Sequence, residues 1–279
     1  MEEPVYQPRE RFEAIRGERG FAAAAPGLWS CGGLEALARP SVAVVGTRAA
    51  TAYGKRLARD FAAQLGAAGC TIVSGLALGI DTAAHLGALD AGAPTVAVLG
   101  SGHERLFPPA NRSLAGRIVA GGGAVLSPYP PGHPAFPHQF LARNGVVAAL
   151  ADAVLVVEAP ARSGALNTAS WAAGHVPVLA VPADVDRRHS QGCLALIRDG
   201  ATLVRCAEDV LEALHLESLP VVAQPSLPLG DPLCAAILDA IRAGTSEIDD
   251  LVAATRAEPR AVLAALTVLE LSGVTLKHS

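Results

Sequence analysis

Short apolar runs rich in β-branched residues alternate along the chain with Ala-rich segments of helical length. We expect strands at Val42–Val45, Thr71–Ser74, Thr95–Leu99, Ala124–Leu126, Ala153–Val157, Val178–Val181 and Thr202–Val204. We expect helices near 54–68, 79–91, 111–121, 143–151, 165–174, 190–199 and 207–214. Buried strands that alternate with helices are typical of βαβ units. The pattern therefore predicts an α/β domain over 41–215, built on a mostly parallel sheet.

The two flanks of this region have different patterns. Residues 1–40 are expected to be a lead-in, with a charged, helical or frayed segment over 1–19 and a Gly/Ala/Pro-rich approach over 20–40. Prolines and a final Gly230 over 216–230 indicate a linker. The remainder, 231–279, has helical periodicity near 232–243, 246–255 and 258–272, then a capping Gly273 and a strand at Val274–Lys277. Three helices and a strand outline a winged-helix-like module.

Composition and charge narrow the classes of function. Hydrophobic residues make up 51% of the chain and aromatic residues only 4%, so the core must consist of Ala, Val and Leu. The net charge of −4 argues against a protein that coats nucleic acid broadly. Residues 41–215 carry 13 basic and 12 acidic side chains, whereas 231–279 carry 4 and 7. A site for a polyanion is therefore expected as a local patch in the central region.

The five cysteines favour a reducing compartment. They are odd in number, widely spaced and without a CxxC pair, so we expect buried thiols rather than disulfides or a zinc site. We also expect no signal peptide and no segment that spans a bilayer. These features predict a cytoplasmic protein.

Four of the predicted strands end in loops rich in Gly, Ser, Thr and Arg. These are Val42–Arg48, Ile72–Asp81, Val96–Gly102 and Val154–Thr168. In an open α/β sheet such loops meet at the carboxyl ends of the parallel strands, where ligands bind. Small residues and helix N-termini bring backbone N–H groups to an anion, and an arginine fork suits phosphate. The sequence thus predicts a phosphate-binding crevice.

The candidate ligands in these loops fall into four groups. They are Gly46, Thr47 and Arg48; Ser74, Gly75 and Gly79; Gly100 and Gly102; and Ser163, Gly164, Asn167 and Thr168. A fifth group, Phe140, Arg143 and Asn144, could place a stacking ring beside a phosphate fork. Each group also has an ordinary structural explanation, such as a helix cap, a buried ring or a surface arginine.

The sequence disfavours a nucleotide cofactor, a metal site and the common catalytic motifs. The first loop lacks the second Gly of G-x-G-x-x-G, and no acid closes the second strand, so we expect no nicotinamide or flavin cofactor. We find no Walker A loop, G-x-S-x-G elbow or metal-ligand cluster. Asp81 and His85 lie four residues apart, which permits a catalytic pair but more often gives a hydrogen bond on a helix surface.

In the order in which they occur along the chain, the motifs resemble those of the DNA-processing protein A family (DprA, also called Smf). The matching stretches are Val45-Gly46-Thr47-Arg48, Val73–Asp81 with His85, Val98–Gly102 with Phe107-Pro108 and Asn111, Phe140 with Arg143-Asn144, Val156–Ala159 with Ser163-Gly164 and Thr168-Ala169, and Ser190 with Gly192, Ile197 and Gly200-Ala201. The resemblance covers about 41–205.

The resemblance implies an extended Rossmann-like domain that binds single-stranded DNA without catalysis. It further implies a homodimer that helps to load the RecA recombinase during natural transformation. By this resemblance the DNA site would include Gly46, Arg48, Ser74, Gly75, Phe140, Arg143, Asn144 and Ser163.

The sequence departs from the family pattern at several positions. Gly145 stands where a second Arg is usual, Pro109 where a basic residue is common, Pro128 where Glu is frequent, and Ala183 where Gly is usual. Arg105 and Arg112 could compensate for the lost positive charge. The family's N-terminal helical domain is expected to be reduced or absent, because only 40 residues precede the first expected strand.

Two alternatives remain open at this point. One is a nucleotide or nucleoside-phosphate hydrolase on a related fold, as in the phosphoribohydrolases, although their Pro-Gly-Gly-x-Gly-Thr loop is missing at 158–168. The other is a module that senses a nucleotide.

Overall fold

The computed structural model describes residues 3–17, 25–216, 232–242, 245 and 248–271. They belong to two units, Met1–Ser218 and Leu219–Ser279. The strands of the first unit are β1 (Val5–Pro8), β2 (Gly27–Cys31), β3 (Ser41–Gly46), β4 (Thr71–Ser74), β5 (Thr95–Val98), β6 (Ala124–Ser127), β7 (Ala153–Glu158), β8 (Val178–Ala180) and β9 (Thr202–Leu203). Its helices are α1 (Arg9–Arg16), α3 (Ala52–Ala67), α4 (Ile80–Asp90), α5 (Arg112–Ala120), α6 (Pro137–Ala149), α7 (Gly164–Ala172), α8 (Gln191–Arg198) and α9 (Ala207–Ala213), with 3-10 turns at Glu35–Ala38, Pro109–Asn111 and Arg188–Ser190.

The first unit is built on one nine-stranded sheet in the order β1-β2-β6-β5-β4-β3-β7-β8-β9. The strands from β3 to β9 pair in parallel, as the hydrophobic runs predict. From β3 the chain proceeds to one side through β4, β5 and β6, and then returns to the other side of β3 through β7. The strand order therefore reverses between β3 and β7, and this is the place where open α/β sheets form a crevice.

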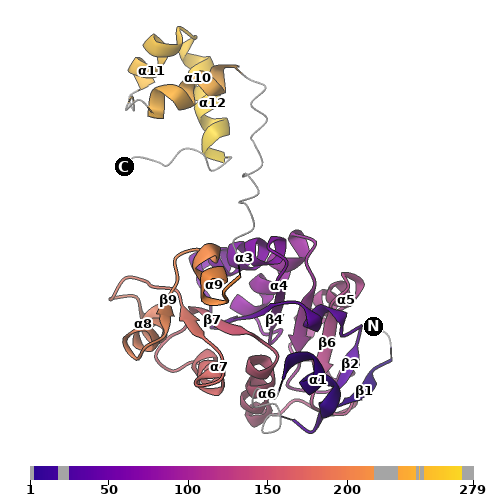
Figure 1. The fold of residues 1–279 in the computed structure, drawn as a ribbon. Helices are drawn as coiled ribbons and strands as arrows, with labels where there is room; N and C mark the ends of the chain where they lie inside the picture. Colours follow the sequence, from indigo (N-terminus) through magenta and orange to yellow (C-terminus); the bar gives the residue numbers. More distant parts are fainter. Residues whose placement is uncertain (1–2, 18–24, 217–231, 243–244, 246–247, 272–279) are drawn as a thin grey trace. The chain divides into compact units, whose positions relative to one another are not determined.

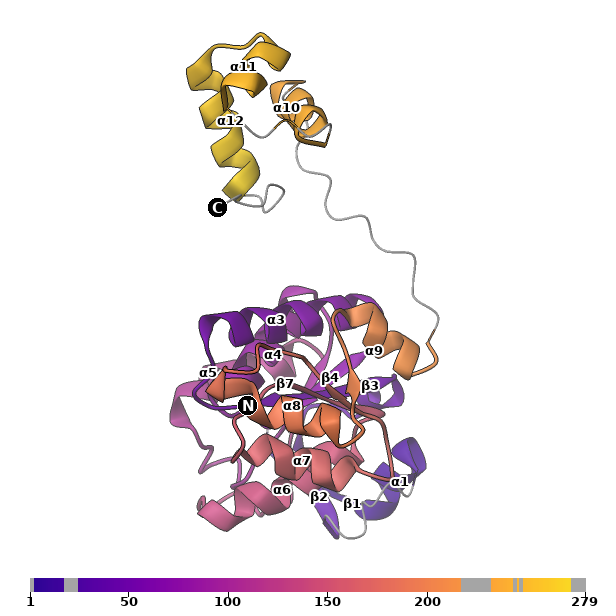
Figure 2. The ribbon, with the colours of Figure 1, turned by 90° about the vertical axis from the view of Figure 1, so that its left-hand side faces the viewer.

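Helices cover both faces of the sheet (Figures 1 and 2). Successive side chains of a strand point to opposite faces. Val42 and Val44 of β3 pack with residues of α3, α4 and α9 such as Phe61. Ala43 and Val45 pack on the other face with residues of α1, α6, α7 and α8. All four residues are buried, which explains why β3 is apolar without alternation.

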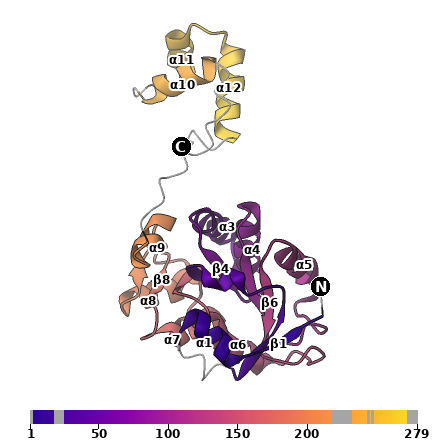
Figure 3. The same cartoon turned by 45° about the vertical axis from the view of Figure 1, so that its right-hand side comes forward.

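Residues 3–17 and 25–31 form more regular structure than the expected lead-in. Val5–Pro8 and Gly27–Cys31 form β1 and β2, which extend the sheet at the edge beside the N-terminus (Figures 1 and 3). β2 is antiparallel to β6, with Trp29 opposite Ser127. Between the two strands, the ring of Phe12 in α1 is fully buried. The segment is thus part of the core of the first unit.

A buried ion pair fixes α1 to this core. Arg16 pairs with Asp152 and donates hydrogen bonds to the carbonyl oxygens of Leu37 and Arg39, both at 3.0 Å. The alternating charges over 1–19 therefore include one charge that the fold buries, and charge patterning alone does not distinguish it from its exposed neighbours.

The described part of the second unit contains three helices, α10 (Pro232–Arg242), α11 (Ile248–Thr255) and α12 (Pro259–Leu271). Their core includes Ile237, Leu251, Val262 and Leu269, so each helix contributes to it. Residues 217–230 of the linker expected over 216–230, the capping Gly273 and the strand over 274–277 lie outside the described residues. Within the described part of the chain, no helix combines the length and hydropathy needed to cross a bilayer.

Candidate functional site

A hollow of about 310 Å³ opens where β3 and β7 end. We call it the central hollow; it is lined by Val45, Gly46, Thr47, Arg48, Ala49, Gly75, Ala77, Asp81, Phe140, Leu141, Arg143, Asn144, Val147, Pro160, Arg162, Ser163, Gly164, Ala165 and Thr168. The lining comes from the end of β3, from the loops after β3, β4 and β7, and from α4, α6 and α7. The reversal of strand order therefore coincides with a cavity.

The loop after β3 is held in place by β7. The backbone N–H of Thr47 donates to the carbonyl oxygen of Glu158 at 2.7 Å. At Gly46 a Cβ atom would lie 2.4 Å from Cγ1 of Ile80, so only glycine allows α4 to approach. Arg48 follows with an exposed side chain, and its guanidinium carbon lies 5.1 Å from the centroid of the Phe140 ring. The loop thus places an exposed cation over an aromatic ring.

Asp81 orders the loop after β4. Its Oδ2 accepts hydrogen bonds from the backbone N–H groups of Gly75 (3.1 Å) and Ala77 (3.3 Å). Burial raises the pKa of this carboxyl group, while the nearby Arg143 and the two N–H groups lower it. The carboxylate therefore fixes the loop from the first turn of α4.

Arg143 forms the floor of the central hollow. Its side chain is buried, and Nη1 donates to the carbonyl oxygens of Gly75 and Val98. Burial lowers the pKa of its guanidinium to about 10, against the favourable charge of Asp81. It thereby ties α6 to the ends of β4 and β5. The sequence predicted a phosphate fork at this position, whereas the structure engages the guanidinium with the backbone.

The opposite wall is the N-terminus of α7. The Oγ of Ser163 caps the helix by accepting the N–H of Ala165 at 3.3 Å. Asn144 of α6 donates from Nδ2 to Gly164 O (3.1 Å) and Asn167 Oδ1 (3.3 Å), which holds α6 and α7 together. Helix N-termini carry positive partial charge, so this wall favours an anion.

A smaller hollow of about 150 Å³ adjoins the central one. We call it the bridging hollow; its lining includes Arg48, Phe140 and Arg143 from the central hollow and adds Leu78, Phe107 and Pro108. The ring centroids of Phe107 and Phe140 lie 5.7 Å apart at an interplanar angle of 57°. Phe107 keeps 44% of its surface exposed. The two rings offer an apolar surface beside Arg48.

The structure divides the predicted site residues into two groups. On the lining of the central hollow lie Gly46, Thr47, Arg48, Gly75, Phe140, Arg143, Asn144, Ser163, Gly164 and Thr168. Behind the lining lie Ser74, Gly79, Gly100, Gly102 and Asn167. The first group comes from three loops and two helices, so the fold brings together the motifs that the sequence placed far apart.

The residues behind the lining shape the site. The Oγ of Ser74 is fully buried and donates to Val44 O at 2.7 Å, which joins β4 to β3. At Gly79 (φ +83°) a Cβ would lie 2.3 Å from Thr47 O, and at Gly100 it would lie 2.6 Å from the Phe140 ring. At Gly102 it would lie 2.1 Å from the carbonyl oxygen of Pro130. These glycines let loops and rings pack closely.

The residues that the sequence analysis did not select include a second exposed cation. Arg162 lines the central hollow directly before the cap residue Ser163. A basic residue next to a helix N-cap was the signal that could have identified it. Leu141 and Pro160 also line the hollow, and nothing in their local sequence marks them.

The sequence analysis expected Asp81 and His85 to form a hydrogen bond on a helix surface. The structure instead gives each of them other partners. His85 is fully buried, and its Nδ1 lies 2.7 Å from Oγ1 of Thr95. Oγ1 of Thr95 donates its own proton to Ile72 O, so Nδ1–H of His85 is the donor to Thr95. Burial lowers the pKa of His85 to about 3. Within the described residues no group of three or more His, Cys, Asp or Glu side chains could hold a metal ion.

The sequence of the chain matches known families and relatives. The family model described as DNA recombination-mediator protein A matches residues 16–215, and the one described as DprA winged helix domain matches 220–278. A DNA processing protein DprA of Mycobacterium tuberculosis is 43% identical over 257 residues, which cover 88% of this chain and 65% of that protein. The DprA of Streptococcus pneumoniae is 42% identical over 185 residues, which cover 66% of this chain and 65% of that protein.

Two solved structures share the fold. DprA from Streptococcus pneumoniae superposes with a TM-score of 0.63 at 41% identity, over 67% of this chain and 66% of that one. DNA processing protein A from Helicobacter pylori, solved to describe its single-stranded DNA binding mode, gives a TM-score of 0.64 at 27% identity, over 76% of this chain and 95% of that one. The chain spans 65% of the length of its mycobacterial and streptococcal relatives. With its central region and its C-terminal helices both matched, the chain belongs to the DNA recombination-mediator protein A family.

Proposed function

We propose that this protein binds single-stranded DNA in the central and bridging hollows. The observation that supports this most directly is the exposed guanidinium of Arg48 beside the Phe140 and Phe107 rings. Binding of a single strand requires a cation for the phosphates and an aromatic face for the unstacked bases. Arg162 and the N-terminus of α7 add a second anion-attracting wall opposite Arg48.

In this proposal Arg48 leaves the Phe140 ring when DNA binds. In the free protein its guanidinium covers a face of the ring, and a base stacked on that face would take its place. The freed guanidinium would then pair with the adjoining phosphate, for which its planar fork is suited. Recognition would not depend on sequence, because every base has a π-face.

We further propose that the protein catalyses no reaction at this site. The acidic side chains nearest to the hollow are Asp81, which lines it, and Glu158, whose Oε2 accepts the N–H of Thr51 at 2.9 Å. Both are buried and engaged with backbone N–H groups, whereas a general base must reach its substrate. This arrangement disfavours the phosphoribohydrolase alternative.

The relatives give this activity a biological setting. The family is described as a recombination mediator, and the Helicobacter protein has a described single-stranded DNA binding mode. We propose that the chain acts likewise as a homodimer in the cytoplasm, where it would deliver single strands taken up during transformation to the RecA recombinase.

Fluorescence anisotropy with labelled single-stranded and double-stranded oligonucleotides across a salt series tests the proposal. We expect tighter binding to single strands, with little dependence on base sequence. Equal affinity for the two forms at physiological salt would overturn it. A parallel assay for release of base or phosphate from nucleotides tests the enzymatic alternative, which would gain support from turnover that disappears in Glu158→Gln.

A further inference from the structure

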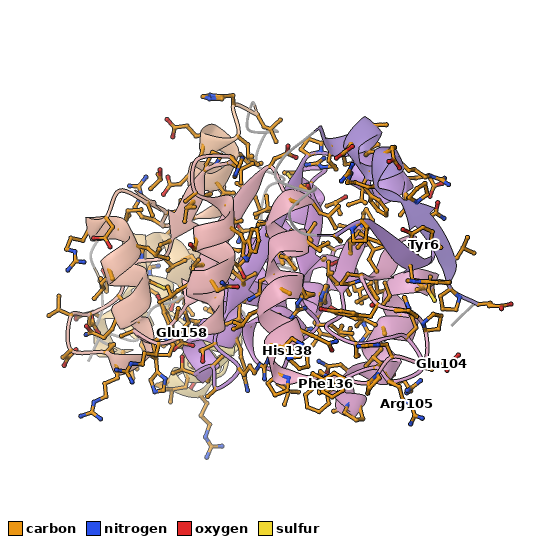
Figure 4. The ribbon with its side chains drawn as sticks, turned by 90° about the horizontal axis from the view of Figure 1, so that it is seen from below. Tyr6, Glu104, Arg105, Phe136, His138 and Glu158 are labelled. Atoms are coloured by element: carbon orange, nitrogen blue, oxygen red, sulfur yellow. The ribbon has the colours of Figure 1, made fainter. Side chains whose placement is uncertain are left out.

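A third hollow of about 460 Å³ lies beyond Phe107. We call it the outer hollow; its lining consists of Arg105, Leu106, Phe107, Pro109 and Arg112 on one side and Gly132, Pro134 and Ala135 on the other. The two sides come from the segments that follow β5 and β6. Figure 4, seen from below, shows Arg105 on the same edge of the molecule as Phe136, His138 and Glu158.

Each hollow shares lining side chains with the next one. The central and bridging hollows have Arg48 and Phe140 in common, and the bridging and outer hollows have Phe107 in common. The Phe107 ring contacts Phe140 on one side and borders the outer hollow on the other. A flexible polymer that occupied the central hollow could therefore continue over the two rings into the outer hollow.

The outer hollow carries positive charge, which suits a polymer with phosphate groups. The side chains of Arg105 and Arg112 are both exposed. Nη2 of Arg112 donates to the carbonyl oxygen of Glu104 at 3.1 Å, whereas the Arg105 side chain makes no hydrogen bond within the part of the chain that the structure describes. One carboxylate lies near this hollow, since a Cβ on the lining residue Gly132 would lie 3.3 Å from Oε2 of Glu104. The lining itself holds two arginines and no acidic residue.

We propose that the outer hollow is a second nucleotide subsite for the same single strand. Arg105 and Arg112 contact a phosphate there, and Phe107 with Pro134 provides the apolar wall for its base. The inference rests on the proposed function of the central hollow.

The test measures affinity against oligonucleotide length. Oligothymidylates of about 4 to about 16 nucleotides are titrated into the full-length wild type and into Arg105→Ala/Arg112→Ala. We expect the double variant to lose roughly tenfold in affinity for the longest strands. It should bind the shortest strands as the wild type does, because these fill the central hollow alone. The log–log salt slope with long strands should become shallower by about 0.7, the value for one single-strand phosphate contact.

Three further variants make the result specific. Arg117→Ala removes an exposed cation of α5 that does not line the hollow, and it should leave affinity within about twofold of wild type. Glu104→Gln removes the opposing carboxylate and should strengthen the binding of long strands. Arg105→Gln alone, which breaks no described hydrogen bond, should still weaken it and guards against misfolding of the double variant.

The outcomes separate this inference from the proposal on which it rests. If the wild type binds no single strand, the function of the central hollow is wrong. If the wild type binds and Arg48→Ala weakens binding, but the double variant and Arg105→Gln leave long-strand affinity and salt slope unchanged, the outer hollow is not a subsite. An equal loss for the shortest and longest strands would also overturn the inference, because it would indicate general charge or a fold defect.

Discussion

Arg48 and Arg143 line the same hollow, and burial separates their roles. Arg48 is exposed and touches the Phe140 ring, so it can reach a ligand. Arg143 is 3% exposed and bonds to two carbonyl oxygens, so its guanidinium is part of the framework. Substitution of each should therefore change a different measured quantity.

Arg48→Ala should weaken binding to all single strands alike and leave the melting temperature unchanged. Because one phosphate contact is lost, the log–log salt slope should become shallower by about 0.7. Oligonucleotide titrations at several salt concentrations measure both quantities. A folded variant with wild-type affinity and slope would exclude Arg48 from the site.

Arg143→Ala should lower the free energy of unfolding by more than about 2 kcal/mol, since it leaves the buried carbonyl oxygens of Gly75 and Val98 without donors. Urea unfolding measures this loss. Arg143→Lys keeps the charge and should recover part of the stability. An Arg143→Ala variant that lost affinity at wild-type stability would instead restore Arg143 as a direct phosphate ligand.

His85 should make the fold sensitive to acid. Its pKa is lowered by burial to about 3, whereas in an unfolded chain it is about 6.5. Between these values the unfolded state binds a proton that the folded state does not, so stability falls as pH falls through this window. The slope from this one group approaches about 1.4 kcal/mol per pH unit.

His85→Asn tests this origin of the pH dependence. Its amide can still donate to Thr95 but does not titrate, so the variant should lose less stability than wild type between pH 7 and pH 4. Thermal melts at both pH values measure the difference. Identical pH dependence in the two proteins would show that the acid sensitivity comes from other groups.

At the scale of elements, the close approach of the loops after β3 and β4 depends on Gly79. Gly79→Ala would place a Cβ 2.3 Å from Thr47 O at a φ of +83°, so the Arg48 loop would have to move. We expect lower stability and weaker single-strand binding. Gly92→Ala is the matched control, because Gly92 also has a positive φ (+67°) but nothing lies within 4 Å of its Cβ position.

Gly92→Ala should cost only the backbone strain, about 1 kcal/mol, and leave affinity unchanged. Unfolding curves and oligonucleotide titrations on both variants separate strain from displacement of the loop. Equal affinities in the two variants would show that the position of the Arg48 loop does not depend on Gly79.

The sequence predicted the parallel strands because burial on both faces leaves a continuous apolar run. It did not predict β1 and β2, whose short runs carry a proline, a glycine or polar residues. β1 pairs only with β2, and β2 joins the sheet through β6, which is distant in sequence. It also placed the start of α6 near 143, although the helix begins at Pro137. Proline is suited to the first turn of a helix, and Oε1 of Gln139 accepts the N–H of Phe136 there.

The same limit applies to the site. Gly-rich strand ends were sufficient to predict which loops line the central hollow, because the ends of parallel strands meet at one edge of the sheet. The roles of Ser74 and Arg143 depend on carbonyl oxygens of other elements, Val44 for the first and Gly75 and Val98 for the second. Such long-range partners do not follow from local spacing, so burial of these side chains could not be predicted.

For the whole molecule, charge separates the contributions of the two units. Residues 231–279 carry 4 basic and 7 acidic side chains, and α12 carries one arginine, Arg260. Recognition helices of winged-helix domains contact the anionic backbone of DNA. A unit with more acidic than basic side chains is repelled by that backbone. We expect that this unit contributes little to the binding of DNA.

Deletion of residues 220–279 should accordingly leave oligonucleotide affinity within a factor of about three, below the tenfold that corresponds to about 1.4 kcal/mol. Anisotropy titrations of both proteins measure this ratio, with the oligomeric state checked by light scattering. A loss of tenfold or more in a folded variant of unchanged oligomeric state would show that the C-terminal unit contacts DNA.

The antiparallel pairing of β2 with β6 has a consequence for synthesis of the protein. Ribosomes deliver the chain from its N-terminus, and roughly 90 residues separate Cys31 from Ala124, so about 5 to 20 s pass before β6 exists. During that interval the apolar side chains of β2 and Phe12 have no sheet to cover them. The strand β2 therefore reaches its partner β6 only after β3, β4 and β5 have been made.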